Sequence, residues 1–274
     1  MIDILLSTYQ SEKYLNELLD SLFNQTCKDW KLIVRDDCSQ DGTMDILLAY
    51  KQKYSDKINL IAGEKNIGVI KSFEYLLNIS TADYIMFCDH DDVWLPFKVE
   101  KTLLEMKKTE NENKDIPVLV HTDLTVVDET LNVKADSFWK FSKLNQKLLS
   151  DFNYLAVCNG ITGCAMMINK TAKEISLPFP KFISMHDSWI ALCVCQKGKI
   201  AYVESSTILY RQHIDNVLGA QEIKATSYIK SKILSLSSFI ETNKKQRKIL
   251  KQFGYNSFFK YYYYKMCYFF KARL

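Results

Sequence analysis

Short apolar segments alternate with amphipathic ones over the first 110 residues of the chain. The apolar segments predict strands at residues 2–7, 30–35, 58–61 and 84–88. Between them, apolar side chains recur every three or four residues, which is the spacing of one helix face. This alternation predicts an α/β fold with a mostly parallel, doubly wound sheet, because right-handed crossovers place helices on both faces. We expect Thr43 to cap the second helix and Pro96 to open the fourth.

The pattern changes after about residue 111. Strands are predicted at residues 118–127, 165–168 and 207–210, with long irregular stretches between them. Long loops in a compact domain usually carry function. From residue 221 onward helical character dominates, so we divide the chain into a sheet domain, 1–219, and a helical C-terminal extension rich in aromatic and basic residues, 220–274.

Composition and charge argue against several classes of protein. The net charge of +4 is too small for a nucleic-acid-binding face. No charge-free apolar run reaches the roughly 18 residues that would span a membrane, and the start Met1-Ile2-Asp3 lacks the basic flank of a signal peptide. The eight cysteines contain no Cys-x-x-Cys pair and are interpreted as buried free thiols. We therefore expect a cytoplasmic protein without a nucleic-acid partner.

Three carboxylates follow the fourth predicted strand directly, at Asp89, Asp91 and Asp92. Carboxylates this close repel one another and remain anionic only beside a positive charge. Oxygen ligands favour Mg²⁺ or Mn²⁺ over zinc, so the cluster predicts a hard metal ion that bridges phosphates. The alternative is an acidic turn that caps the next helix.

Polar residues also follow the first two strands. Thr8 and Tyr9 come after the first, and Asp36 and Asp37 after the second. An Asp-rich turn that ends in glycine is common and needs no function of its own. Ligands of a doubly wound sheet, however, bind at the carboxyl ends of the strands. Together with the acidic cluster, these residues are suited to surround a nucleoside diphosphate.

At this point the sequence resembles the family 2 glycosyltransferases of the GT-A fold, over roughly residues 1–219. The matching segments are Ser7-Thr8-Tyr9-Gln10, Asp36-Asp37-Cys38-Ser39-Gln40-Asp41-Gly42-Thr43, Asn66-Ile67-Gly68, Asp89-His90-Asp91-Asp92-Val93-Trp94, His186-Asp187-Ser188-Trp189 and Tyr210-Arg211-Gln212-His213. Their order and spacing make the resemblance specific.

The resemblance implies roles for individual residues in donor binding. It places Thr8, Tyr9 and Asp37 around the nucleoside. It places Asp89 near the ribose and Asp91 on the metal, Mn²⁺ or Mg²⁺.

Lys71 is implied near the nucleotide as well. The family commonly has serine where Cys38 stands and glutamine where His90 stands. Neither departure removes a carboxylate, so the implied chemistry is unaffected.

Asp187 is the implied catalytic base, which would remove the proton of the acceptor hydroxyl as that oxygen attacks the anomeric carbon. The alternative is that Asp187 only caps a helix over residues 188–195. The resemblance further suggests that His213 reaches the metal or the diphosphate. Arg211 would pair with phosphate oxygens through its several N–H donors.

The acceptor site is less clearly marked. Residues 160–165, with Gly160 and Gly163, resemble the segment of the family that lies beneath the acceptor. Trp139 and Trp189 could stack on sugar rings, although core packing is the commoner use of tryptophan.

Aromatic and basic residues are interleaved from residue 255 to the end of the chain. This composition suits a helix at a membrane surface, and the alternative is a helix that packs on the domain or on a second subunit. A membrane surface agrees with a lipid-linked acceptor at the inner face of the plasma membrane.

The resemblance implies an inverting, metal-dependent transfer of a sugar from a nucleotide diphosphate to a glycan or lipid-linked acceptor in polysaccharide synthesis. By analogy, dTDP-rhamnose is the first expected donor and a UDP-hexose the second. Two alternatives remain: a metal-dependent phosphohydrolase, because Asp-x-Asp after an apolar strand also marks those enzymes, and a sugar-nucleotide-binding module without catalysis.

Overall fold

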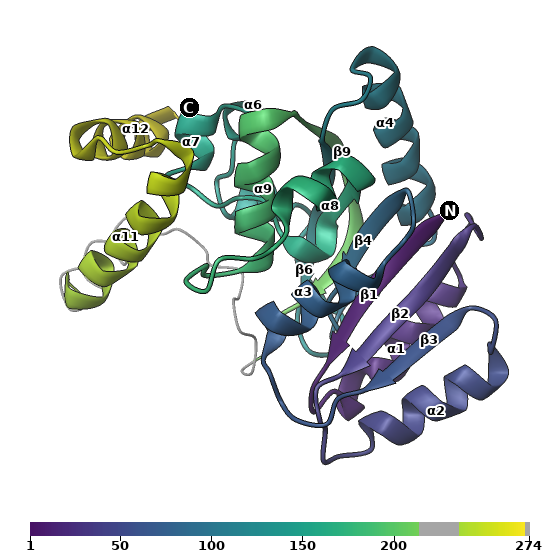
Figure 1. Ribbon diagram of the computed structural model, residues 1–274. Coiled ribbons are helices and arrows are strands. Elements are labelled where there is room, and N and C mark those ends of the chain that lie inside the picture. The colour runs from purple at the N-terminus through teal and green to yellow at the C-terminus, as the bar shows by residue number, and fades with distance from the viewer. Residues whose placement is uncertain (214–235, 272–274) are drawn as a thin grey trace.

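The structure is a computed structural model that describes residues 1–213 and 236–271 (Figure 1). Its first half contains β1 (Ile2–Thr8), α1 (Glu12–Phe23), β2 (Trp30–Asp36), α2 (Thr43–Lys53), β3 (Ile58–Ala62), α3 (Val69–Ile79), β4 (Tyr84–Cys88), β5 (Val93–Trp94), α4 (Lys98–Glu112) and β6 (Val118–Val127). The elements after β6 are β7 (Val133–Ala135), α5 (Phe138–Phe141), α6 (Gln146–Leu149), α7 (Phe152–Leu155), the 3₁₀ turn η1 (Gly163–Ala165), β8 (Met166–Asn169), α8 (Lys170–Ser176), α9 (His186–Lys197), β9 (Lys199–Arg211), α11 (Leu236–Leu250), the 3₁₀ turn η2 (Lys251–Phe253) and α12 (Phe258–Lys271).

Within the described residues one nine-stranded sheet organises the molecule, in the order β3-β2-β1-β4-β8-β6-β9-β5, with β7 paired to β6. The strands β3, β2, β1 and β4 are parallel, as the sequence predicts. β8 lies antiparallel between β4 and β6, while β6 and β9 are parallel to each other. The sheet is therefore largely parallel on one side and mixed on the other.

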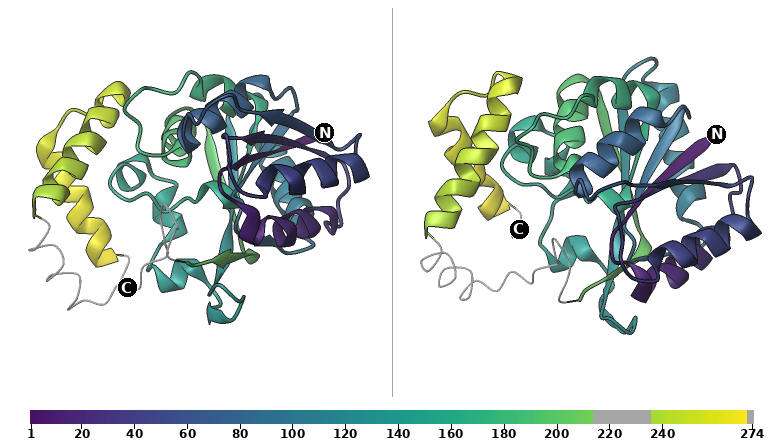
Figure 2. Two further views of the ribbon diagram at one scale, coloured as in Figure 1. Left: turned by 90° about the horizontal axis from the view of Figure 1, so that it is seen from below. Right: turned by 60° about the horizontal axis from the view of Figure 1, so that its bottom comes forward.

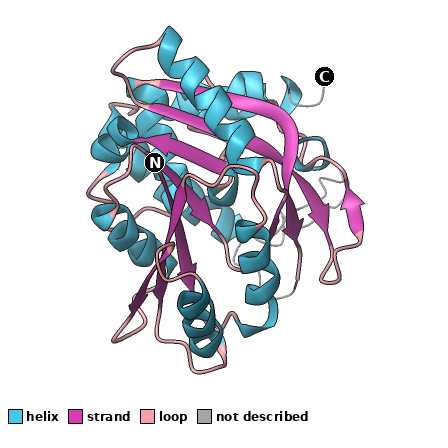
Figure 3. Ribbon diagram, turned by 90° about the vertical axis from the view of Figure 1, so that its right-hand side faces the viewer, coloured by secondary structure: helices cyan, strands magenta, loops and turns pink. Residues whose placement is uncertain are grey.

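Helices cover both faces of this sheet, as Figure 3 shows. One face packs on α1, α2 and α4 through an apolar core that includes Leu18, Leu47 and Met106. The other packs on α3, α8 and α9, with Phe73 and Ile190 in its core. This two-faced covering agrees with the fold predicted from the alternating pattern.

The C-terminal helices α11 and α12 lie side by side at the end of the molecule farthest from β1, β2 and β3 (Figure 2). Their buried residues, among them Leu250, Tyr261 and Tyr268, join the core on the α9 face. Phe253 between them lies 5.2 Å from the ring of Trp189. The extension therefore packs on the sheet domain, while the proposed boundary at residue 219 falls outside the described residues.

Some local predictions need correction. The cap of α2 is Gly42 and not Thr43, whose hydroxyl instead accepts from Ser11 and donates to Asp41. Pro96 lies two residues before α4, which begins at Lys98.

The strand predicted at residues 207–210 is the end of a much longer strand, β9, which begins directly after α9. The turn into it needs a glycine, because a Cβ on Gly198 would lie 1.9 Å from the carbonyl oxygen of Pro117. Partly exposed and polar residues in the first half of β9 hide the strand pattern in the sequence.

All eight cysteines are free. No helix in the described part of the chain is long and apolar enough to cross a membrane.

Candidate functional site

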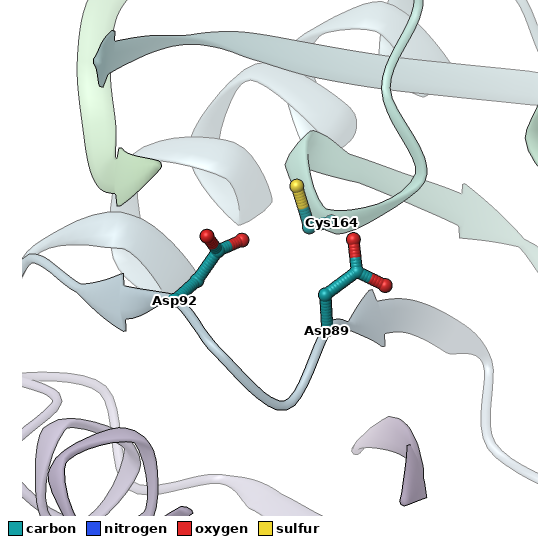
Figure 4. Close-up of side chains that lie close together, drawn as sticks. All are labelled: Asp89, Asp92 and Cys164. Atoms are coloured by element: carbon teal, nitrogen blue, oxygen red, sulfur yellow. The ribbon is translucent and has the colours of Figure 1, made fainter. Parts of the chain in front are cut away.

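The acidic residues form the turn between β4 and β5. β4 is paired on both sides, with β1 and β8, and β5 pairs with the end of β9. The sheet therefore holds both ends of the turn. Asp89 and Asp92 stand at its two ends with Cys164 of η1 beside them, and ligand atoms of the three lie within 4.8 Å of one another (Figure 4).

Negative charge in this turn is poorly compensated. The pKa of Asp89 is raised to about 7, first by burial and then by the charges of Asp91 and Asp187. Burial also raises the pKa of Asp92 well above its ordinary range, with Asp91 and Asp89 adding to it. One oxygen of Asp92, Oδ2, is buried without a hydrogen-bond partner among the described residues. Such a cluster is suited to a cation, which would favour the charged carboxylates.

The chemistry of the donors indicates which cation fits. Burial raises the pKa of the Cys164 thiol well above its ordinary range, and a protonated thiol is a poor metal ligand. The donors are then mainly carboxylate oxygens, which suit Mg²⁺ or Mn²⁺. His213 adds an imidazole, with Nε2 2.9 Å from Oδ2 of Asp91. The carboxylates of this turn therefore fit a hard divalent ion.

Arg211 ties the end of β9 to this turn. Its backbone amide donates to Asp92 Oδ1 at 3.1 Å, and its Nε donates to the carbonyl of Asp91 at 2.8 Å. The remaining nitrogens reach Glu17 and the carbonyl of Glu129. The side chain is 1% exposed, and its described contacts position the turn and, two residues later, His213. That it pairs with phosphate stays a prediction.

Asp187 lies in the first turn of α9, on the same side of the sheet as Phe73 and Phe87. Its Oδ2 accepts from the amide of Gly163 at 3.1 Å, and its Oδ1 accepts from the amide of Ser188. A side chain on residue 163 would collide with His186, since a Cβ there lies 2.8 Å from Nε2. Burial raises the pKa of Asp187 to about 6, although both amides lower it. The alternative of a helix cap is wrong, because the N-cap of α9 is Met185.

His186, next to the base candidate, belongs to the core. Its ring lies 4.1 Å from that of Phe73 and 5.2 Å from that of Phe87. Burial lowers its pKa to about 3, so the ring is neutral at physiological pH. It packs beneath Asp187 without adding charge to the site.

The ends of β1 and β2 carry the residues expected around the nucleoside. Thr8 is buried, and its hydroxyl donates to Asp36 at 3.0 Å, so it helps to hold the loop that follows β2. The hydroxyl and amide of Ser39 also donate to Asp36. Tyr9, one residue later, is 48% exposed. Of this pair, Tyr9 is therefore the residue that can contact a ligand.

Asp37 links the end of β2 to the start of α3. It accepts from the amides of Ile67 and Gly68 at 2.8 and 2.7 Å and pairs with Arg35. Burial alone would raise its pKa, but the Ile67 amide, the Arg35 guanidinium and the Gly68 amide lower it overall. The side chain is thus an anion at neutral pH, at the strand edge where β1 also ends. Lys71, in the first turn of α3, is exposed.

Several residues that shape the site were not singled out from the sequence. Lys98 is fully buried with its Nζ 4.4 Å from the centre of the Trp94 ring, and burial lowers its pKa to about 8. Nothing in an amphipathic helix such as α4 marks one lysine as buried. Arg35 could have been found from the sequence, because a charged residue that follows three apolar ones near the end of a strand, two positions before Asp37, indicates a buried ion pair.

Trp189 is not available to a sugar. Its ring is buried in the α9 core, and its Nε1 donates to the carbonyl of Ser176 at 2.7 Å. Trp139 is buried to the same extent, at 8% exposed, but it lines a surface groove.

Comparison with known proteins places this site in context. The sequence profile described as Glycosyl transferase family 2 matches residues 3–176. The chain is 25% identical over 226 residues to the putative teichuronic acid biosynthesis glycosyltransferase TuaG of Bacillus subtilis, covering 82% of this chain and 84% of TuaG. It is 26% identical over 230 residues to the dTDP-rhamnosyl transferase RfbG of Shigella flexneri, covering 78% and 74%.

Solved structures agree in fold. S. aureus TarS, residues 1–349, in complex with UDP-GlcNAc has a TM-score of 0.59 at 18% identity over 85% of this chain and 64% of that one. The mannosyltransferase PcManGT of Pyrobaculum calidifontis, in complex with GDP-Man and Mn²⁺, has a TM-score of 0.54 at 14% identity over 85% and 59%. The chain spans about 60% of the length of these structures, and the common fold is GT-A.

Proposed function

Because this chain belongs to glycosyl transferase family 2, we propose that it transfers a sugar, with inversion and with a divalent metal, from a nucleotide diphosphate to a hydroxyl of a growing polysaccharide. One observation carries the proposal: Asp187 of α9 accepts from the amide of Gly163, and the next residue, Cys164, has its sulfur within 4.8 Å of a carboxylate oxygen of Asp89, so a candidate base and the acidic turn share one site. Family membership argues against the phosphohydrolase alternative.

The donor is proposed to bind along the ends of β1, β2 and β4. Exposed Tyr9 offers its ring to the nucleobase. The anion Asp37 lies at the same edge; it is 2% exposed and accepts from two backbone amides just before α3, so its proposed part is to hold the start of α3 beside the nucleoside. Lys71 is exposed where a phosphate could reach it. Asp89 is assigned to the ribose, while buried Thr8 holds the loop after β2 in place.

Asp91 and His213 are proposed to hold the metal, Mn²⁺ or Mg²⁺, whose charge would stabilise the leaving diphosphate. The contact of 2.9 Å between Asp91 Oδ2 and His213 Nε2 supports this pair. Arg211 supports this pair indirectly, since it donates to the carbonyl of Asp91 and to the side chain of Asp92.

Asp187 is proposed to act on the acceptor. Its carboxylate accepts the proton of the acceptor hydroxyl while that oxygen bonds to the anomeric carbon, and the bond from that carbon to the diphosphate oxygen breaks. The nucleoside diphosphate leaves with the bonding electrons, on the opposite face of the sugar. Two amides hold Asp187 in place, and burial raises its pKa to about 6. A general base is most effective when its pKa lies near the pH at which the enzyme works.

The donor sugar is proposed to be rhamnose from dTDP-rhamnose, with a UDP-hexose as the second candidate. RfbG, named a dTDP-rhamnosyl transferase, supports the first, and TarS, solved with UDP-GlcNAc, supports the second.

A donor panel tests this proposal. The purified chain is incubated with Mn²⁺ or Mg²⁺ and dTDP-rhamnose, UDP-glucose, UDP-GlcNAc or GDP-mannose, and released nucleoside diphosphate is scored. We expect release from one nucleotide class, through slow transfer to water, and none in excess chelator. Release from none of the four, with or without an added saccharide acceptor, would contradict the proposal.

We further propose that the chain works at the inner face of the plasma membrane, on a lipid-linked or glycan acceptor. While Tyr261 and Tyr268 of α12 are buried, Phe259, Tyr263, Met266 and Phe270 are exposed at helical spacing. Residues 243–274 contain nine Lys and Arg and no Asp or Glu, so the other 242 residues carry a net charge of −5 within the total of +4. An apolar stripe on a strongly basic segment suits an anionic lipid surface.

Replacement of Phe259 and Phe270 by serine should weaken binding to vesicles containing anionic phospholipid by about tenfold or more, because each ring contributes apolar area. Salt should weaken the binding of the native chain. The matched control is Leu104→Ser, since Leu104 of α4 is 70% exposed at another place on the surface. Point variants are preferable to removal of α12, which would uncover the core around Tyr261. A native chain that does not sediment with such vesicles at low ionic strength would refute the membrane proposal.

A further inference from the structure

A groove of about 690 Å³ lies between the β6 and β9 side of the sheet and the helices α5, α6 and α12. Six of the residues that line it are Asp123, Trp139, Gln146, Tyr202, Glu204 and Lys271. None of them belongs to the residues that the proposed function uses for donor, metal or base.

Gln146 is the unusual residue in this lining. The side chain is 7% exposed, yet neither the oxygen nor the nitrogen of its amide has a hydrogen-bond partner in the described part of the chain. Burial of an amide without partners costs free energy, so buried amides are almost always paired. A partner from outside the chain would satisfy both atoms, and it would need to donate and accept hydrogen bonds.

Aromatic rings form one wall of the groove. Trp139 and Tyr202 pack edge to face, with ring centres 5.9 Å apart and planes at 85°. Asp123 fixes this wall, because it accepts from the amide of Trp139 at 3.1 Å and from the hydroxyl of Ser137. The rings are thereby held in place before any ligand arrives.

The groove is connected to the base candidate through one short loop. Gly160 packs directly against Leu144, which lines the groove, since a Cβ on Gly160 would lie 3.1 Å from a methyl of Leu144. Three residues later the amide of Gly163 donates to Asp187. Three residue steps span at most about 11 Å. The loop from residue 160 to residue 163 thus links the wall of the groove to the contact that holds Asp187.

We propose that this groove binds an oligosaccharide, namely the part of the acceptor glycan that precedes the hydroxyl to be glycosylated. Sugar hydroxyls donate and accept, as the Gln146 amide requires, and the apolar face of a sugar ring can pack on the half-buried ring of Tyr202, which Trp139 contacts edge to face. Charges in the lining are balanced, with Asp123, Asp136 and Glu204 against Lys140, Lys147 and Lys271. This balance favours a neutral glycan over an anionic or cationic ligand. The proposal rests on the proposed function.

Saturation-transfer NMR with maltotriose, chitotriose, mannotriose and a rhamnose trisaccharide tests the groove without turnover. We expect at least one probe to bind the full chain and Gln146→Leu to weaken that binding at least about tenfold. The melting temperature of Gln146→Leu should be unchanged or higher, because the variant removes an unpaired buried amide of similar size. A glutamine with a purely structural role would give the opposite thermal result.

The controls separate the groove from catalysis. Gln252→Leu changes an exposed glutamine outside the lining and should leave binding unchanged. Tyr202→Ala removes one of the two rings of the aromatic wall. It provides a second groove variant for the binding measurement if Gln146→Leu does not fold. Nucleoside diphosphate release in water should be the same in both groove variants, so loss of that release tells against the proposed function and not the groove. Binding of none of the trisaccharides, or unchanged binding by both groove variants, would overturn the proposal.

Discussion

Asp187→Asn should lower the rate of sugar transfer by about 10²–10⁴-fold, equivalent to roughly 3–5 kcal/mol of transition-state stabilisation. The dissociation constant of the donor should hardly change, because the carboxylate acts on the acceptor hydroxyl. Asparagine keeps one oxygen that can accept from the Gly163 amide, so we expect the local structure to be retained. Transfer rate and donor affinity, measured on the same preparation, test both expectations.

The same variant should change the dependence of rate on pH. The base must be deprotonated, and the pKa of Asp187 is about 6, so the native rate should fall as the pH drops through 6. This acidic limb should be absent from the residual activity of Asp187→Asn. The assignment would be contradicted if the native profile had no acidic limb near pH 6, or if Asp187→Asn kept that limb.

Thermal stability distinguishes a base from a structural carboxylate. A carboxyl whose pKa is raised on folding stabilises the native state at low pH and loses that contribution as the pH rises through the folded value. Asp187→Asn should therefore melt no lower than the native chain at pH 8. Asp151, which caps α7 through the amide of Asn153, is the matched control: Asp151→Ala should cost about 0.5–2 kcal/mol of stability and no catalysis. Asp187→Asn with near-native transfer would refute the assignment.

The parallel half of the fold was predictable because its strands are mostly apolar. β1 is buried at every position and β4 at four of its five, so periodicity and length identify them without tertiary information. β5 consists only of Val93 and Trp94 and forms through pairing with β9. A two-residue strand has no periodicity, so only the folded sheet reveals it.

The position of polar groups in the site was predictable, but their partners were not. Asp91 was identified as one of the carboxylates directly after an apolar strand, and Asp187 through the resemblance to the family. Arg211, by contrast, is buried against the acidic turn and contacts Glu17 and the carbonyl of Asp91, which come from distant parts of the chain. Pairings of this kind depend on sheet order, which the sequence pattern leaves open.

Asp91→Asn should abolish metal-dependent turnover, because the amide keeps the shape of the side chain and removes its charge. The native chain should lose activity in excess chelator and recover it with Mn²⁺. His213→Ala should weaken metal affinity to a smaller extent, since a neutral imidazole contributes less attraction than a carboxylate.

Melting temperature provides a readout that does not depend on turnover. Without metal, Asp91→Asn should be at least as stable as the native chain at pH 8, because the charge of Asp91 raises the pKa of Asp89 and of Asp92. With metal at about 100 times its dissociation constant, the native chain should gain about 2.7 kcal/mol, and Asp91→Asn should gain much less.

Asp45→Asn is the matched control for this comparison, since it removes an exposed carboxylate from α2, away from the acidic turn. The order of the two stabilities should therefore reverse when Mn²⁺ is added, and only for the Asp91 variant. This reversal requires that Asp91 repels its neighbours in the free protein and binds the ion in the loaded one. Equal stabilisation of the native chain and Asp91→Asn by Mn²⁺, or full activity of the variant, would show that the ion binds elsewhere.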